Sequence, residues 1–164
     1  MSLTIGIDPG SRITGYGLVE RRGAEIVYIG SGIIKTAAAG PIERRLLTIK
    51  RELDGVIARY HPAAVAVEEI FMAKNPKSTL TLGEARGVVL LAAAEAGLSV
   101  FEYTPREVKS SVTGAGGAHK SQVAAMVGRL MKLDHEPETE DETDALAVAF
   151  CHATRASTIR GKLT

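Results

Sequence analysis

Four acidic residues, each next to an apolar segment, are the part of this chain whose residue types and spacing could do chemistry. Asp8 follows the apolar run at residues 3–7, and Glu68 closes a second run at residues 63–67. Asp141 and Asp144 stand three residues apart at the start of an apolar helical pattern, so both project from one face of a first helical turn. Carboxylates are hard oxygen ligands, which suit Mg²⁺ or Mn²⁺.

Each acid also has a simpler structural explanation. Asp8 precedes Pro-Gly, a sequence that forms turns. Asp141 and Asp144 could serve only as caps or as favourable partners of a helix dipole. The dipole explanation does not account for the acids that end the two strands, so both interpretations stay open at this point.

The segments that must position these acids alternate between strand and helix patterns. Residues 3–8 have a period of two, with Thr4, Gly6 and Asp8 on one side. Further strands are expected at residues 14–20, 25–35, 63–70 and 99–103. Helices are expected at residues 42–60, 79–97, from 105, 123–131 and 141–156. The order predicts an α/β domain in which helices flank a mixed five-stranded sheet, with the strand at 63–70 parallel to an earlier one.

This arrangement would bring the acids together if the Glu68 strand lies beside the Asp8 strand and the last helix packs across both. Four like charges in one place would raise one another's pKa unless divalent cations compensated them. A pair of such ions can activate water and stabilise the departing oxygen of a phosphodiester, which is a nuclease mechanism. No Cys and His spacing in the chain suggests zinc.

The length of 164 residues fits one domain, which we place at residues 1–156, followed by a mobile basic tail at 157–164. The longest strongly apolar stretch, residues 87–94, is too short to cross a bilayer, and no signal peptide is expected. The single cysteine, Cys151, cannot form an internal disulfide. We therefore expect a cytoplasmic protein with no membrane partner.

The net charge of +1 hides a strong asymmetry. Residues 134–144 contain seven of the 19 acids and no Lys or Arg, so the rest of the chain has 20 basic residues against twelve acids, a balance of +8. Such a chain could bind a polyanion and still concentrate carboxylates at a metal. A solvated acidic loop on a mildly basic protein explains the charge equally well.

Two glycine-containing segments have spacings that could serve a function. GAGGAHKS (residues 114–121) resembles a phosphate-binding loop, but His119 replaces the second glycine and the segment follows a helix, so nucleotide binding is not supported. Lys120 could still contact a phosphate, or the segment could be an ordinary linker. Gly83 and Gly87 lie one turn apart in the helix at 79–97, which could let a second subunit approach closely.

Several motifs together resemble the RuvC family of Holliday-junction resolvases. They are GIDPGSRITGYG (6–17), AVEEIFMAKNPKS (66–78), LGEARGVV (82–89), FEYTPREVK (101–109) and TDALAVA (143–149). The resemblance covers roughly residues 4–154. It implies an RNase H-like fold, a homodimer, and a nuclease that nicks two opposing strands of a four-way DNA junction during recombination and repair, in cooperation with a branch-migration motor.

The resemblance also implies roles for individual residues. The four acidic active-site positions of the family correspond to Asp8, Glu68, Asp141 and Asp144, with two Mg²⁺ (or Mn²⁺) per site. Phe71 matches an aromatic that stacks on an unpaired base, and Lys109 and Lys120 match lysines near the cleaved phosphate. Further contacts to the DNA backbone are expected from Arg12, Lys74, Lys77 and Arg86, for which a solvated surface role is the alternative.

Two other functions are compatible with parts of the sequence. The segment 6–17 is also similar to the phosphate loop of actin-like ATPases and sugar kinases, but those proteins have two such domains and this chain has the length of one. A module that binds junctions without cutting them is the non-enzymatic alternative. The presence of all four acids at the family positions argues against it.

Overall fold

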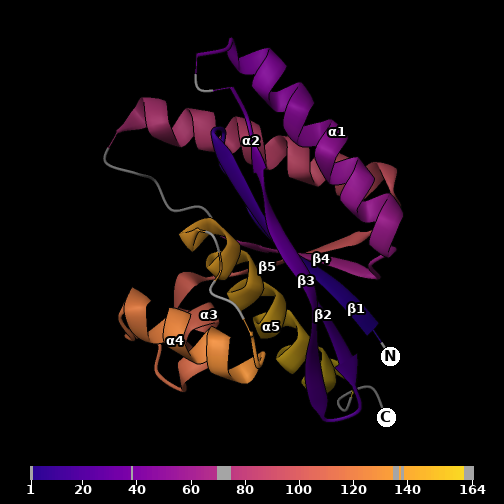
Figure 1. The fold of residues 1–164 in the computed structure, drawn as a ribbon, viewed down its shortest axis with the longest axis vertical. Helices are drawn as coiled ribbons and strands as arrows, with labels where there is room; N and C mark the ends of the chain where they lie inside the picture. Colours follow the sequence, from indigo (N-terminus) through magenta and orange to yellow (C-terminus); the bar gives the residue numbers. More distant parts are fainter. Residues whose placement is uncertain (1, 38, 70–74, 135–136, 138, 161–164) are drawn as a thin grey trace.

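A computed structural model describes residues 2–37, 39–69, 75–134, 137 and 139–160 of the chain, without the side chains of 157–160. The elements are β1 (Ser2–Asp8), β2 (Ile13–Arg22), β3 (Glu25–Lys35), α1 (Ile42–Tyr60), β4 (Ala64–Glu68), α2 (Pro76–Glu95), β5 (Ser99–Tyr103), α3 (Pro105–Thr113), α4 (Lys120–Leu130) and α5 (Glu140–Arg160). Their order is the one expected from the sequence. Figure 1 shows the strands crossing the middle of the molecule between two groups of helices.

The five strands form one mixed sheet in the order β3-β2-β1-β4-β5. Strands β1, β2 and β3 form an antiparallel meander, whereas β4 lies parallel to β1 and to β5. This topology follows from the connections, because a short turn reverses the chain and a helical crossover returns the next strand in parallel. The predicted α/β fold with a mixed five-stranded sheet is therefore confirmed.

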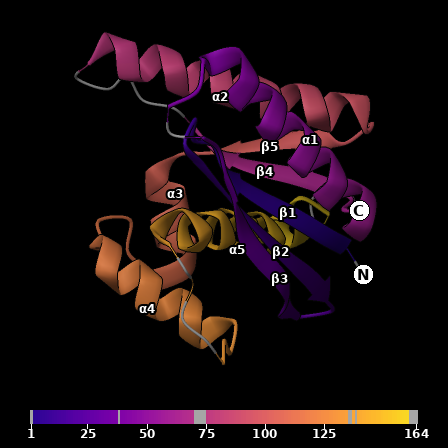
Figure 2. The same ribbon diagram turned by 45° about the horizontal axis from the view of Figure 1, so that its top comes forward.

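Helices cover both faces of the sheet. Helices α1 and α2 pack on one face, and α5 crosses the other with α3 and α4 beyond it (Figure 2). The alternation along β1 divides the core accordingly. Ile5 and Ile7 belong to the cluster under α1 and α2, whereas Gly6 faces Ala145 and Ala149 of α5. Asp8 is two residues after Gly6, so its side chain points to the same face of the sheet, the one covered by α5.

Three glycines let α5 lie directly against β1 and β2. A Cβ built at Gly6 would lie 2.1 Å from the Ala145 carbonyl oxygen, and one built at Gly15 would lie 2.0 Å from the Asp141 carbonyl oxygen. At Gly17 an added Cβ would lie 2.7 Å from the Leu146 side chain. The backbone of the helix thus occupies the space that side chains would fill, and its first turn is brought onto the end of the sheet.

Two helix boundaries differ from the predicted ones, and a local cap explains the first. Helix α2 begins at Pro76, before the predicted residue 79, because the Asn75 side chain accepts a hydrogen bond from the Lys77 amide at 3.0 Å and Pro76 takes the first helical position. Helix α5 continues to Arg160, beyond the predicted end at residue 156. Cys151 is fully buried in α5 and acts as a small core residue.

Candidate active site

The acids that end β1 and β4 are neighbours because these strands are adjacent and parallel. Ile7 pairs with Val67, and the next residue on each strand is an acid, Asp8 on β1 and Glu68 on β4. Ala66, two residues before Glu68, packs in the core cluster that contains α5. Both carboxylates therefore leave the sheet at the same edge and on the face that α5 covers.

The first turn of α5 supplies the second pair of acids. Its backbone touches β2 at Gly15, which pairs with Asp8 in the antiparallel ladder. This contact fixes Asp141 and Asp144 beside the end of β1. The closeness has electrostatic consequences, because Asp144, Asp141 and Glu68 each contribute to the raised pKa of Asp8.

The pKa values record how crowded this cluster is. Burial, followed by repulsion from Asp144, Asp141 and Glu68, raises the pKa of Asp8 from 3.8 to about 7. Burial and the charge of Asp144 raise the pKa of Glu68, and burial raises the pKa of Asp144 against the opposing effect of Lys120. The cluster thus holds more negative charge than its surroundings compensate.

Lys120 partly compensates this charge through direct ion pairs. Its Nζ lies 3.1 Å from Asp144 Oδ2 and 2.8 Å from Glu140 Oε2. The pKa of Lys120 is raised, first by the hydrogen bond to Glu140 and then by Asp144. Lys120 opens α4, whose N-terminus is capped by His119, so the segment that resembled a phosphate loop instead directs one ammonium group at the acids.

The donor set suits a hard divalent cation. In the described part of the chain, no three acidic, histidine or cysteine side chains are placed closely enough to hold one metal ion. Uncompensated carboxylates repel one another, and one of them already pairs with Lys120. The acids would have to draw together around a cation, which would relieve the repulsion that raises the pKa of Asp8.

Glu142 is a functional-site neighbour that the sequence interpretation did not single out. Its side chain is 4% exposed, and Oε1 accepts a hydrogen bond of 2.6 Å from the Ser31 hydroxyl. This contact joins the first turn of α5 to β3, while Asp141 and Asp144 flank Glu142 in sequence. The signal was available, because Glu142 lies four and seven residues before the buried Leu146 and Ala149 and therefore on the same helix face.

Comparisons with known proteins agree on one family. The family model for the crossover junction endodeoxyribonuclease RuvC matches residues 4–152. A RuvC from Pseudomonas putida W619 is 48% identical over 160 residues, covering 97% of this chain and 91% of that protein. A RuvC from Pseudomonas fluorescens Pf-5 is 50% identical over 158 residues, covering 96% and 90%. The chain belongs to the RuvC family.

Solved structures match this RuvC-family chain over nearly its whole length. The Thermus thermophilus RuvC in complex with a Holliday junction substrate has a TM-score of 0.90 and 36% identity, covering 96% of each chain. The yeast mitochondrial resolvase Ydc2 has a TM-score of 0.70 at 11% identity, covering 96% of this chain and 80% of its own, and shares the fold. The expected RNase H-like fold is confirmed by this likeness.

The other residues predicted to serve the RuvC-family site lie at different distances from the acids. Lys109 on α3 is close enough to lower the pKa of Glu68. Arg86 is not directed at the acids as placed: it forms a 2.7 Å ion pair with Glu102 of β5. Arg12 and Lys77 line a separate pocket. Phe71 and Lys74 lie outside the described residues.

Among the described residues of this RuvC-family chain, no helix combines the length and apolar character needed to cross a lipid bilayer.

Proposed function

We propose that this member of a metal-dependent nuclease family resolves four-way DNA junctions by paired nicks, using Asp8, Glu68, Asp141 and Asp144. The observation that carries the proposal is the convergence of strand-end and helix acids, in which burial and then the charges of Asp144, Asp141 and Glu68 raise the pKa of Asp8 to about 7. Without a cation, such buried like charges destabilise the folded protein. With a cation bound, they can serve a reaction. The reaction would support homologous recombination and DNA repair, in the cytoplasm where the DNA is found.

The four carboxylates would hold two Mg²⁺ ions, with Mn²⁺ as a substitute. When bound, the ions would supply an activated water and positive charge for the departing oxygen, and cleavage would leave 5′-phosphate and 3′-hydroxyl ends. The protein's own contribution is to hold its acids at the edge of the sheet by the contact between α5 and Gly15. Lys109 and Lys120 would donate hydrogen bonds to the phosphate oxygens and offset the charge that develops there.

Recognition of the junction would draw on further residues. Phe71 would stack on an unpaired base near the crossover, an interaction worth about 1–3 kcal/mol per base. Lys74 and Arg86 would add contacts to the backbone. For Arg86 this requires that its ion pair with Glu102 open or share the guanidinium, since the Arg86 side chain is only 14% exposed. A branch-migration motor on the same junction is the partner expected for this family.

Two nicks on opposing strands require two active sites, so the working form would be a homodimer. Helix α2 offers the surface, since Leu80 and Leu91 are 66% and 52% exposed and share a face with Gly83 and Gly87. A Cβ at either glycine would meet nothing within 4 Å in the protomer, which leaves room for a second subunit. Sedimentation of the wild type at micromolar concentration should give a dimer, and the L80E/L91E variant should give a monomer. A monomeric wild type would contradict this part.

The function is tested with a synthetic four-way junction and a linear duplex of the same sequence. The wild type with Mg²⁺ should nick the junction symmetrically and leave the duplex intact, and Asp8→Asn should abolish nicking. Asp54→Asn is the matched control, because Asp54 lies on α1 and pairs with Lys50. Equal cutting by the wild type and Asp8→Asn, or full activity in excess chelator, would refute the role of Asp8 in metal-dependent cleavage.

A further inference from the structure

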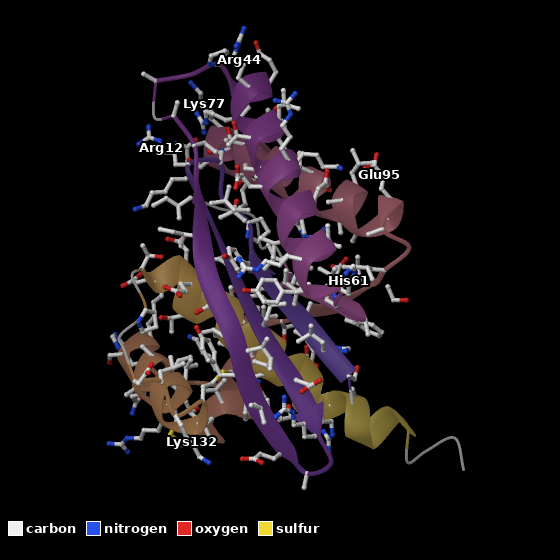
Figure 3. All side chains as sticks on the ribbon, turned by 45° about the vertical axis from the view of Figure 1, so that its right-hand side comes forward. Arg12, Arg44, His61, Lys77, Glu95 and Lys132 are labelled. Atoms are coloured by element: carbon white, nitrogen blue, oxygen red, sulfur yellow. The ribbon has the colours of Figure 1, made fainter. Side chains whose placement is uncertain are left out.

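A second polar site lies at the same end of the sheet as Asp8. It is on the face covered by α1 and α2, opposite the face on which the acids lie. It is an open pocket of about 510 Å³ between the β1–β2 turn and the first turns of α1 and α2. Its lining combines three cations (Arg12, Arg45 and Lys77) and three hydroxyl side chains (Ser11, Ser78 and Thr81) with one apolar residue, Leu82. Figure 3 shows Arg12 and Lys77 at the same end of the molecule as Arg44, far from Glu95 and His61.

The wall of this pocket formed by the β1–β2 turn is fixed by hydrogen bonds. The Ser11 carbonyl oxygen accepts from Arg45 Nε at 3.0 Å and from Thr36 Oγ1 at 2.7 Å. The Arg12 carbonyl oxygen accepts from the Thr36 amide at 3.0 Å. Arg45 therefore holds the turn while its charge stays at the pocket, and the exposed Arg12 side chain leaves from a fixed backbone. A pre-organised site of this kind loses little entropy when a ligand binds.

No ion pair among the described residues compensates the positive charge of the pocket. Among the ion pairs of the described residues, none uses Arg12, Arg45 or Lys77. The first turn of α2 contains no acid, and that of α1 contains one, the exposed Glu43. Guanidinium, ammonium and hydroxyl donors line the pocket, and none of the lining residues is aromatic. This donor set fits the oxygens of a phosphate better than a base or an apolar side chain.

The location links this pocket to the acids. Ser11 and Arg12 follow Asp8 across the Pro-Gly turn, so the two sites lie on the two sides of one strand end. We propose that this pocket is a second phosphate subsite, which binds a backbone phosphodiester of a junction arm away from the cleaved bond. The inference rests on the proposed function and adds Arg45 and the hydroxyl groups to Arg12 and Lys77 as one built site. It holds the arm as it passes around the edge of the sheet.

The test measures junction affinity, under conditions without cleavage, as a function of salt for the wild type and for Arg12→Ala/Lys77→Ala. These residues are exposed and make no ion pair within the described residues, so the variant should fold. Losing two phosphate contacts should reduce the slope of log Kobs against log salt by about 1.8 and weaken binding on the order of 10- to 100-fold near 0.1 M salt. Arg51→Ala is the control, because Arg51 is exposed on α1 outside the pocket and should leave both values unchanged.

A second measurement locates the phosphate. Neutral methylphosphonate linkages are placed one at a time along one arm of the junction. At one position away from the cleaved bond, the neutral linkage should lower the affinity of the wild type for the junction. At that position the same linkage should leave the affinity of the double variant unchanged. Equal salt slopes for the wild type and the double variant, or equal losses at every linkage, would overturn the subsite. A wild type that binds but does not cut the junction would instead refute the proposed function and leave this test intact.

Discussion

Replacing Gly15 by Ala should disable the active site without touching a charged side chain. The added Cβ would lie 2.0 Å from the Asp141 carbonyl oxygen, whereas real Cβ contacts of this kind stay above 3.0 Å, so the strand or the helix must move by about 1 Å. Alanine is otherwise better suited to a strand than glycine, so the close contact dominates. A misplacement of about 1 Å costs roughly 10²-fold in rate, and overpacking costs about 1–3 kcal/mol of stability.

The assay is single-turnover cleavage of a four-way junction at saturating Mg²⁺, well below the melting temperature of every variant. Gly55→Ala is the matched control, since Gly55 lies in α1 and an added Cβ would meet nothing within 4 Å. The control should keep full activity and gain about 0.5–1 kcal/mol of stability from the better helix propensity of alanine. If Gly15→Ala folds and cuts as fast as the control, the contact between α5 and β2 does not position the acids.

Three further predictions concern charge and hydrogen bonding. The pKa of Asp8 is raised from 3.8 to about 7 in the folded protein, so the metal-free wild type should lose stability as pH rises through that window. In a denaturant titration at pH 8 in chelator, the free energy of unfolding of Asp8→Asn should exceed that of the wild type by on the order of 2 kcal/mol, and this difference should vanish near pH 4. Lys120→Met should bind Mg²⁺ several-fold more tightly by calorimetry, because the ammonium group no longer competes for Asp144, yet cut about 10²-fold more slowly; weaker Mg²⁺ binding would contradict the competition. Tyr103→Phe should cost about 1–3 kcal/mol in chemical denaturation, because the buried His152 Nδ1 loses its 2.7 Å partner, and an unchanged midpoint would mean that water replaces the hydroxyl.

Much of the fold could be predicted because local patterns determine it. The period of two at residues 3–8 and the apolar run at 63–67 indicate strands, and the helical crossover between them requires a parallel pair. The start of α2 differs from the predicted one because Asn75 and Pro76 begin the helix within a segment whose sequence is typical of a loop. The ion pair between Arg86 and Glu102 could not be predicted, because no local pattern indicates that a residue of a later strand reaches Arg86.

The sequence by itself determined which acids could serve the site, since Asp8 and Glu68 end strands and Asp141 and Asp144 open a helix. Only the tertiary structure decided how closely they meet and what surrounds them. Gly6, Gly15 and Gly17 have no side chains, which lets a helix more than a hundred residues later in the sequence pack against their strands. Lys120 reaches Asp144 from another helix. The pKa of Asp8 depends on these distant neighbours and on burial, which no stretch of sequence specifies by itself.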